Sequence, residues 1–116
     1  MRTYHWLAAV LAGLLLAVTG GLPVLAAEDM PSFRLECNNG VFKPQKLLVP
    51  AGKKFRIDIF NTGTEAIEFE SLQLRKEKAL NPGGNSFVVV YPLDAGEYKF
   101  FDDFHIQVGL GSLVAR

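Results

Sequence analysis

Apolar and polar residues alternate along most of the chain after residue 30. In "SFRLEC", Phe33 and Leu35 alternate with Arg34 and Glu36. The same alternation runs through "FRIDI" (55–59) and "IEFE" (67–70). A period of two is typical of antiparallel strands with one buried face, and no window of helical length repeats apolar residues every 3.6 positions. The pattern therefore predicts an all-β chain.

Turn signals separate these expected strands at short intervals. "PAG" (50–52), "NPGG" (81–84) and "DAG" (94–96) combine the residues that tight turns favour. Between the last two turns, "SFVVVYPL" is rich in the β-branched and aromatic residues that strands favour. A short final strand is expected at "GSLVAR" (111–116). About seven strands at this spacing predict a single β-sandwich domain.

The first 29 residues have a different pattern. Arg2 precedes an apolar run from Trp6 to Val18, and small residues follow the helix-breaking "GGLP". This arrangement predicts a signal peptide, residues 1–27, cleaved after Ala26 or Ala27, and an exported, periplasmic domain over residues 28–116. An uncleaved anchor is the alternative, although the apolar run is shorter than the about 20 residues of a membrane span.

Composition narrows the classes of function. The chain has 12 basic and 12 acidic residues and a formal net charge of +0, so no strong field attracts nucleic acid or an anionic membrane. Cys37 is the only cysteine, which excludes an intrachain disulfide. A small buried side chain is its expected role, and a metal or redox role is the alternative.

The chemistry-bearing residues gather in "YKFFDDFHIQVGLGSL" (98–113). Asp102 and Asp103 lie three and two positions before His105, which is the single histidine after residue 27. The sequence has no Gly-rich phosphate loop, Ser-His-Asp pattern or zinc-spaced Cys/His cluster, so a hydrolase or transferase is not expected. A carboxylate and imidazole site for a metal is the hypothesis that remains.

Three segments taken in order resemble the cupredoxins. They are "VFKPQKLLVPAGKKFRIDIFNTG" (41–63), "NPGGNSFVVVYPLDAGEYKFF" (81–101) and the histidine loop that follows. The resemblance implies a cupredoxin-like Greek-key β-sandwich. In blue-copper members of this family, the loop reads Cys, two residues, His, and then a Met after a glycine. By this resemblance Asp102 takes the cysteine position, His105 the histidine position, and Leu110 the methionine position.

The family's other histidine comes shortly after the Asn-x-Gly, where this chain has Glu65 and Glu68. Exchange of soft ligands for carboxylates favours Cu(II), Fe(II) or Fe(III), and excludes an ordinary blue-copper carrier because such a site needs a thiolate. We therefore expect a copper or iron site of Asp102, His105 and either Glu68 or Glu65. Glu68 is preferred, and Asp103 is the expected partner of the second imidazole nitrogen.

A narrower resemblance rests on "AIEFES", "LRKEK", "GEYKF" and "FFDDFH". Together these are similar to the EfeO-type cupredoxin-like proteins, which are periplasmic and associated with oxidase-dependent iron permeases. The resemblance implies a ferroxidase-type activity that delivers iron to a membrane iron permease. It also implies a periplasmic iron-binding or electron-transfer partner.

Two other functions stay open at this point. One is a copper or iron chaperone without redox turnover, and the other is a metal-free structural subunit of a membrane complex. Simpler explanations also exist for the candidate ligands, because alternating glutamates often form the solvent face of a strand and loop aspartates often hold a turn.

Overall fold

The computed structural model describes residues 30–116, and the predicted signal peptide (1–27) lies outside these residues. The described chain forms nine strands and one short 3-10 turn, η2 (Asp103–His105). The strands are β1 (Ser32–Asn38), β2 (Val41–Lys43), β3 (Lys46–Val49), β4 (Phe55–Asn61), β5 (Ile67–Ser71), β6 (Lys76–Leu80), β7 (Asn85–Val90), β8 (Gly96–Asp102) and β9 (Leu110–Ala115). The all-β prediction is confirmed.

The structure has β2 and β6 in addition to the about seven strands that the sequence predicts. Strand β2 has only three residues, which is too short for a visible alternation. Strand β6, "KEKAL", lies at a sheet edge and buries only Leu80 among its five residues. Charged edge strands of this kind lack an apolar pattern, and their charges oppose pairing with other chains.

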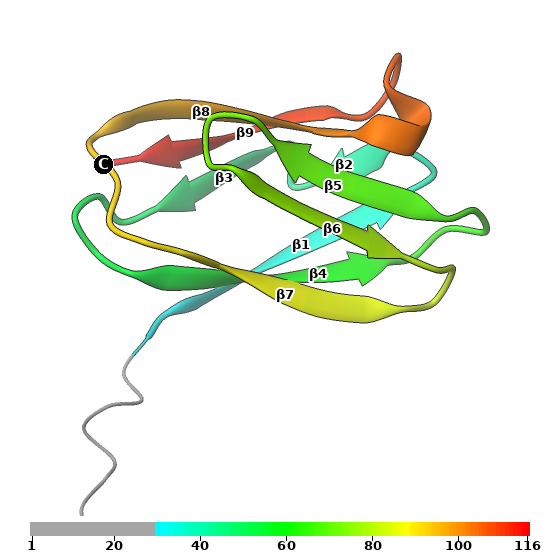
Figure 1. The fold of residues 1–116 in the computed structure, drawn as a ribbon, viewed down its shortest axis with the longest axis horizontal. Coiled ribbons are helices and arrows are strands. Elements are labelled where there is room, and N and C mark those ends of the chain that lie inside the picture. Colours follow the sequence, from blue (N-terminus) through cyan, green and yellow to red (C-terminus); the bar gives the residue numbers. More distant parts are fainter. Residues whose placement is uncertain (1–29) are drawn as a thin grey trace, which may run out of the picture.

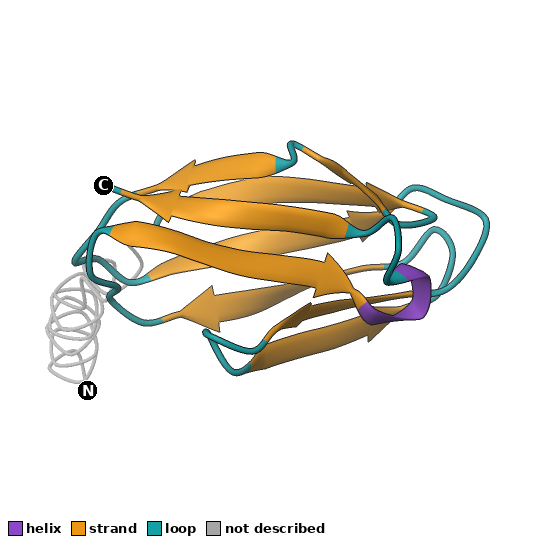
Figure 2. Cartoon of the chain, turned by 90° about the horizontal axis from the view of Figure 1, so that it is seen from above, coloured by secondary structure: helices purple, strands orange, loops and turns teal. Residues whose placement is uncertain are grey.

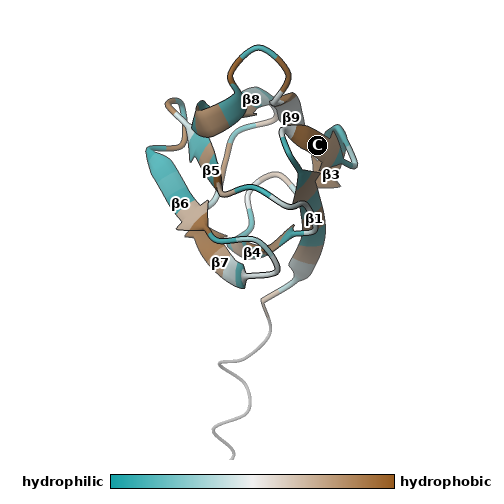
Figure 3. Ribbon diagram, turned by 90° about the vertical axis from the view of Figure 1, so that its right-hand side faces the viewer, coloured by the Kyte–Doolittle hydropathy of each residue, from teal (hydrophilic) through white to brown (hydrophobic). Residues whose placement is uncertain are grey.

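Two sheets pack face to face as a sandwich (Figures 1 and 3). One sheet has the order β2-β1-β4-β7, and the other has the order β3-β9-β8-β5-β6. Two neighbouring pairs are parallel, β1 with β4 and β3 with β9, while the remaining pairs are antiparallel. The two-sheet sandwich agrees with the prediction, whereas the two parallel pairs differ from the antiparallel pairing that the period of two suggested.

Inward-facing residues of both sheets fill the core. Phe42 meets Phe100 edge-to-face with ring centroids 4.8 Å apart, and Phe69 lies 5.3 Å from the Phe100 centroid. Phe100 points inward from β8, so the period of two also turns Asp102 inward, two residues later. A carboxylate therefore continues the apolar face of β8 where that strand ends. The turn η2, purple in Figure 2, begins there, at one end of the sandwich.

None of the residues from 30 to 116 belongs to a helix long and apolar enough to cross a membrane.

Candidate functional site

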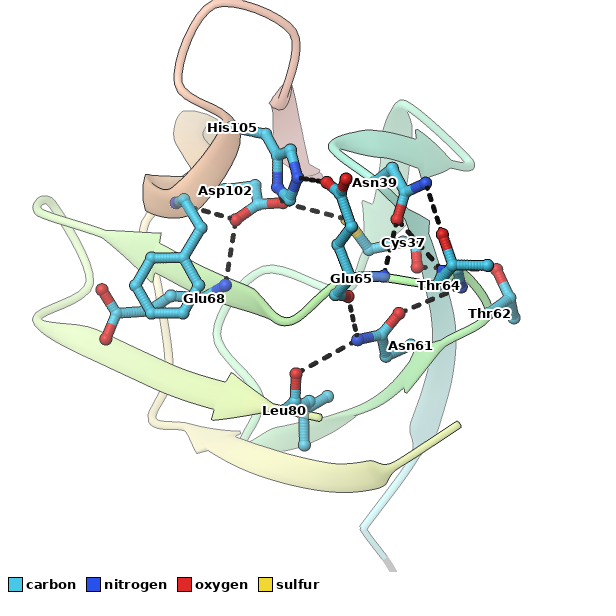
Figure 4. A network of polar contacts seen from close by, with 12 residues as sticks. Cys37, Asn39, Asn61, Thr62, Thr64, Glu65, Glu68, Leu80, Asp102 and His105 are labelled. Carbon is cyan, nitrogen blue, oxygen red and sulfur yellow. Dashed lines mark hydrogen bonds and ion pairs between the residues drawn. The ribbon is translucent and has the colours of Figure 1, made fainter. Parts of the chain in front are cut away.

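Asp102 is the centre of a polar network at this end of the sandwich (Figure 4). Its side chain has 0% exposed surface. Oδ1 accepts the backbone N–H groups of Glu68 (2.9 Å) and Phe104 (3.0 Å), so it joins β5 to the cap of η2. Oδ2 lies 2.7 Å from Nδ1 of His105 and accepts the thiol of Cys37 at 3.7 Å. Both oxygens are thus fully engaged inside the protein.

His105 lies between two carboxylates. Its Nδ1 faces Asp102, and its Nε2 faces Oε1 of Glu65 at 2.5 Å. The two carboxylates differ, because Asp102 is buried while the side chain of Glu65 is 62% exposed. The hydrogen bond to Glu65 raises the pKa of His105, burial lowers it, and Asp102 raises it further, with a net rise above the ordinary 6.5. The geometry therefore favours an imidazolium that donates to both carboxylates.

The loop before β5 holds Glu65 in place. Oδ1 of Asn39 accepts the backbone N–H groups of Thr64 (3.1 Å) and Glu65 (3.0 Å), and Nδ2 of Asn61 donates to the Glu65 carbonyl (2.9 Å). Asn61 is buried, and its Oδ1 also accepts the N–H of Gly63. The "Asn-x-Gly" of the sequence is therefore a structural clamp that sets the position of Glu65.

Cys37 completes the interior side of the network. Burial is the main cause that raises the pKa of its thiol, to about 12, and the negative charge of Asp102 adds to it, whereas a backbone hydrogen bond from Gly40 opposes it. At neutral pH the side chain is a protonated thiol that donates to Asp102. In this arrangement the thiol is therefore a buried donor that helps to hold Asp102.

Two glycines make room for this network. A Cβ on Gly40, whose φ is +92°, would lie 2.7 Å from Cβ of His105. A Cβ on Gly109 would overlap Cβ of Asp102 and lie 2.9 Å from the Asp102 backbone nitrogen. The loop between η2 and β9 therefore packs directly on Asp102, and a larger residue at 109 has no room.

We expect Gly109→Ala to destabilise the protein by about 1–3 kcal/mol, as overpacking of a tight interior contact does. The neighbours that the new methyl group meets include backbone atoms, which cannot turn aside. Urea unfolding measures the change, with Gln107→Ala at an exposed position of the same loop as the control. Equal stability of the two variants would contradict the close packing of this loop on Asp102.

Glu68 and Asp103 point to a different place from His105. Their carboxylates lie with that of Glu70 within 4.8 Å of one another, which makes the one such gathering of three acidic or metal-ligating groups among residues 30–116. The pKa of Glu68 is raised, mainly by burial and then by the negative charges of Glu77, Asp103 and Glu70. The pKa of Glu70 is raised in the same way, mainly by burial and then by the negative charges of Asp103 and Glu77.

The structure thus divides the expected ligands into two groups. It brings Glu65, His105 and Asp102 together, but it joins Glu68 to them only through a backbone N–H. The partner expected for the second imidazole nitrogen, Asp103, is wrong, because Asp102 and Glu65 take both nitrogens. From the sequence, a metal or redox role for Cys37 was only an alternative, and the two clamp asparagines had no place in the site, although "NTG" was a visible signal.

The position of the family's methionine is also turned away from the network. Leu110 is 56% exposed and lines a hollow on the outer face of the sheet with Phe101 and Lys99. Leu110, a hydrocarbon side chain turned outward, would therefore contribute nothing to holding a metal.

The donor set fits a hard or borderline metal and does not fit blue copper. His105 Nε2 and Glu65 supply an imidazole and a carboxylate near the surface, which suit Cu(II) or Fe ions. Asp102 contacts the other ring nitrogen, Nδ1, and so fixes the orientation of the ring, as the carboxylate that bonds to a metal-bound histidine does. The fully engaged oxygens of Asp102 make it a positioning residue and not a ligand in this arrangement.

Comparisons with known proteins agree with this fold. A protein of Rickettsia prowazekii (strain Madrid E) of uncharacterised function is 34% identical over 89 residues, which cover 77% of this chain and 71% of that protein. Among solved structures, the purple cupredoxin of Nitrosopumilus maritimus is 17% identical with a TM-score of 0.56, covering 72% of this chain and 99% of that one. The auracyanin of Roseiflexus castenholzii is 16% identical with a TM-score of 0.59, covering 73% and 96%.

A third solved structure is the metal-binding domain of the Cu(I)-exporting ATPase CopA of Streptococcus pneumoniae. It is 15% identical with a TM-score of 0.61, and the match covers 73% of this chain and 84% of that domain. The model of the cupredoxin-like domain family matches residues 7–115. This chain therefore belongs to the cupredoxin-like domain family.

Proposed function

We propose that this protein is an exported, periplasmic metal-binding protein that holds copper at His105 Nε2 and Glu65. One observation carries the proposal, namely that buried Asp102 fixes Nδ1 of His105 and thereby directs Nε2 to an exposed carboxylate. A bound metal ion would replace the proton that Nε2 and Glu65 share. Cu(II) bound there would supply a one-electron acceptor.

Known relatives of the fold support a metal-binding role. The CopA domain named above was solved with Cu(I), and another similar structure is a copper-binding protein in its apo form, 19% identical with a TM-score of 0.59. The ligands differ in this chain, since a carboxylate and an imidazole favour the higher oxidation state of copper over Cu(I). We therefore propose Cu(II), with iron as the second candidate.

The finer proposal, service to a ferrous iron uptake system, rests on the EfeO-type resemblance. In it, Fe(II) is the substrate and the carboxylates of Glu68, Glu70 and Asp103 bind it, since iron favours oxygen ligands. Its conversion to Fe(III) releases one electron, which bound Cu(II) or a periplasmic electron-transfer partner would accept. The product would pass to a membrane iron permease.

A titration with Cu(II), and with Fe(II) in the absence of oxygen, tests where metal binds. We expect His105→Ala and Glu65→Gln each to weaken Cu(II) binding at least tenfold, because each removes one of two protein ligands. Glu36→Gln, another surface carboxylate, serves as the control. Glu68→Gln with Asp103→Asn should leave Cu(II) binding unchanged and weaken Fe(II) binding.

The outcomes separate the three functions. Copper binding lost in His105→Ala, together with Fe(II) oxidation by the copper-loaded protein, supports the ferroxidase proposal. The same binding without oxidation indicates a copper or iron chaperone. Binding no stronger in the wild type than in His105→Ala would overturn the metal proposal and favour a metal-free structural subunit.

A further inference from the structure

The outer face of the sheet β3-β9-β8-β5-β6 has an apolar hollow of about 590 Å³ (Figure 2 looks toward β8 and β9 of this sheet). Leu72, Phe101 and Leu110 line it, and Leu72 and Leu110 are 70% and 56% exposed. The outer face of a sheet in a sandwich normally presents polar side chains to the solvent. Clustered exposed apolar side chains rimmed by polar residues mark an interaction surface.

Charges are unevenly distributed around this hollow. Lys46 and Lys99 lie on the β3 and β8 side of its rim, where Lys46 pairs with Glu97 at 3.6 Å. The β5 and β6 side is acidic, because Glu70 faces Glu77 across these two strands. Lys99 therefore lies on the rim of this hollow, and Glu70 lies beside it, lining a neighbouring hollow to which Leu72 also contributes.

The strand register places these charges symmetrically about the apolar residues. Glu70 lies directly opposite Phe101, and Lys99 precedes Phe101 by two residues on the same face of β8. Leu72 follows Glu70 by two residues and lines the hollow with Lys99. Glu70 and Lys99 thus lie on either side of the line that joins Leu72 to Phe101.

This arrangement is self-complementary. A twofold axis that lies in the face along the line from Leu72 to Phe101 brings each of these two apolar residues against its own copy. The same rotation sets Lys99 of one copy against Glu70 of the other, twice in each dimer. A patch that fits itself in this way is the requirement for a closed twofold interface, and opposite charges at its rim fix the register.

We propose that two copies of this chain dimerise through this face, with Leu72 and Phe101 on the twofold axis, Leu110 beside Phe101, and Lys99 against Glu70 of the second copy. The acidic cluster supports the proposal, since Glu68, Glu70 and Asp103 crowd together in one copy and Glu70 would gain the charge of Lys99 in the pair. The proposal does not depend on copper at His105 and Glu65, but it shares Glu70 with the proposed Fe(II) cluster.

Sedimentation equilibrium of the full chain with a chelator present tests the proposal. The wild type should show a monomer–dimer equilibrium, and Lys99→Glu and Glu70→Lys should each raise its dissociation constant at least tenfold. An equal mixture of these two variants should restore wild-type dimerisation, because each reversed charge then meets its opposite. Lys53→Glu, an exposed lysine between β3 and β4, is the control and should change nothing.

Leu110→Asp tests the apolar residues beside the axis in the same experiment and should also abolish the dimer. Val41→Asp in the other sheet, where Val41 is 59% exposed, is its matched control. A monomeric wild type, dimerisation insensitive to Lys99→Glu, or a mixture that fails to restore pairing would each overturn the proposal. Association that appears only when copper or iron is added would overturn it as well, since the pairing would then be metal-bridged.

Discussion

Replacement of Asp102 by alanine should lower the free energy of unfolding by about 3–5 kcal/mol, which is large for a single substitution. The carboxylate has 0% exposed surface and accepts hydrogen bonds from four groups. Alanine would leave the backbone N–H groups of Glu68 and Phe104 without their acceptor. Each such buried, unsatisfied donor costs about 1–3 kcal/mol.

Urea unfolding of the metal-free protein measures this effect against two other variants. Asp102→Asn keeps the shape and one oxygen for the two backbone donors, so we expect a smaller loss than with alanine. Asp58→Ala removes a partly exposed carboxylate that pairs with Arg56, and we expect a loss of about 1 kcal/mol or less. An Asp102→Ala protein as stable as the Asp58→Ala protein would show that the network does not stabilise the fold.

The sheet architecture was predictable because its strands are amphipathic. Strand β4 alternates buried and half-buried positions along its whole length, and "FRIDIFN" displays that pattern directly. Strand β6 was not predictable in this way, since "KEKAL" lies at an edge with only Leu80 buried. The position of an edge strand is set by the neighbouring strand with which it pairs. A period-two pattern appears in the sequence only where one face of the strand is buried in the core.

The candidate site shows a different limit of prediction from the sequence. The loop of Asp102 and His105 was visible as a short local motif, because side chains three residues apart can be brought together by one turn. The choice between Glu65 and Glu68 was not local, since it depends on Asn39 and Asn61 holding the β4–β5 loop. The contact of Cys37 with Asp102 joins residues 65 positions apart and requires both sheets to be in place.

The fold should lose stability as pH rises through the pKa of His105. In the unfolded chain this pKa is near 6.5, and in the folded protein the hydrogen bond to Glu65, with a further contribution from Asp102, raises it. A raised folded pKa means that the contribution of the imidazolium is fully present below about pH 6.5 and is lost as pH rises through the folded value. The difference in unfolding free energy between wild type and His105→Gln should therefore shrink from pH 6 to higher pH.

His105→Gln is the necessary reference because other groups titrate too. The raised pKa values of Glu68 and Glu70 lower stability as these carboxylates ionise, but that change is common to both proteins and cancels in the difference. NMR of the chelator-treated protein gives the pKa directly, and His5 is the one other histidine in the sequence. A His105 pKa at or below 6.5 would contradict the imidazolium between two carboxylates.

Copper binding should depend on the same proton of His105, but in the opposite direction: the affinity should rise with pH, whereas the stability of the metal-free fold falls. An imidazolium has no lone pair for a metal, so binding at Nε2 must release the proton that Nε2 shares with Glu65. Cu(II) affinity should therefore rise over the pH range in which the metal-free fold loses the imidazolium contribution, and both curves should have their midpoint at the NMR pKa of His105. Glu65→Gln should move both midpoints to lower pH together, because the main cause of the raised pKa is gone. If only one midpoint moves, the metal does not bind where the proton does, and copper coordination at Nε2 is wrong.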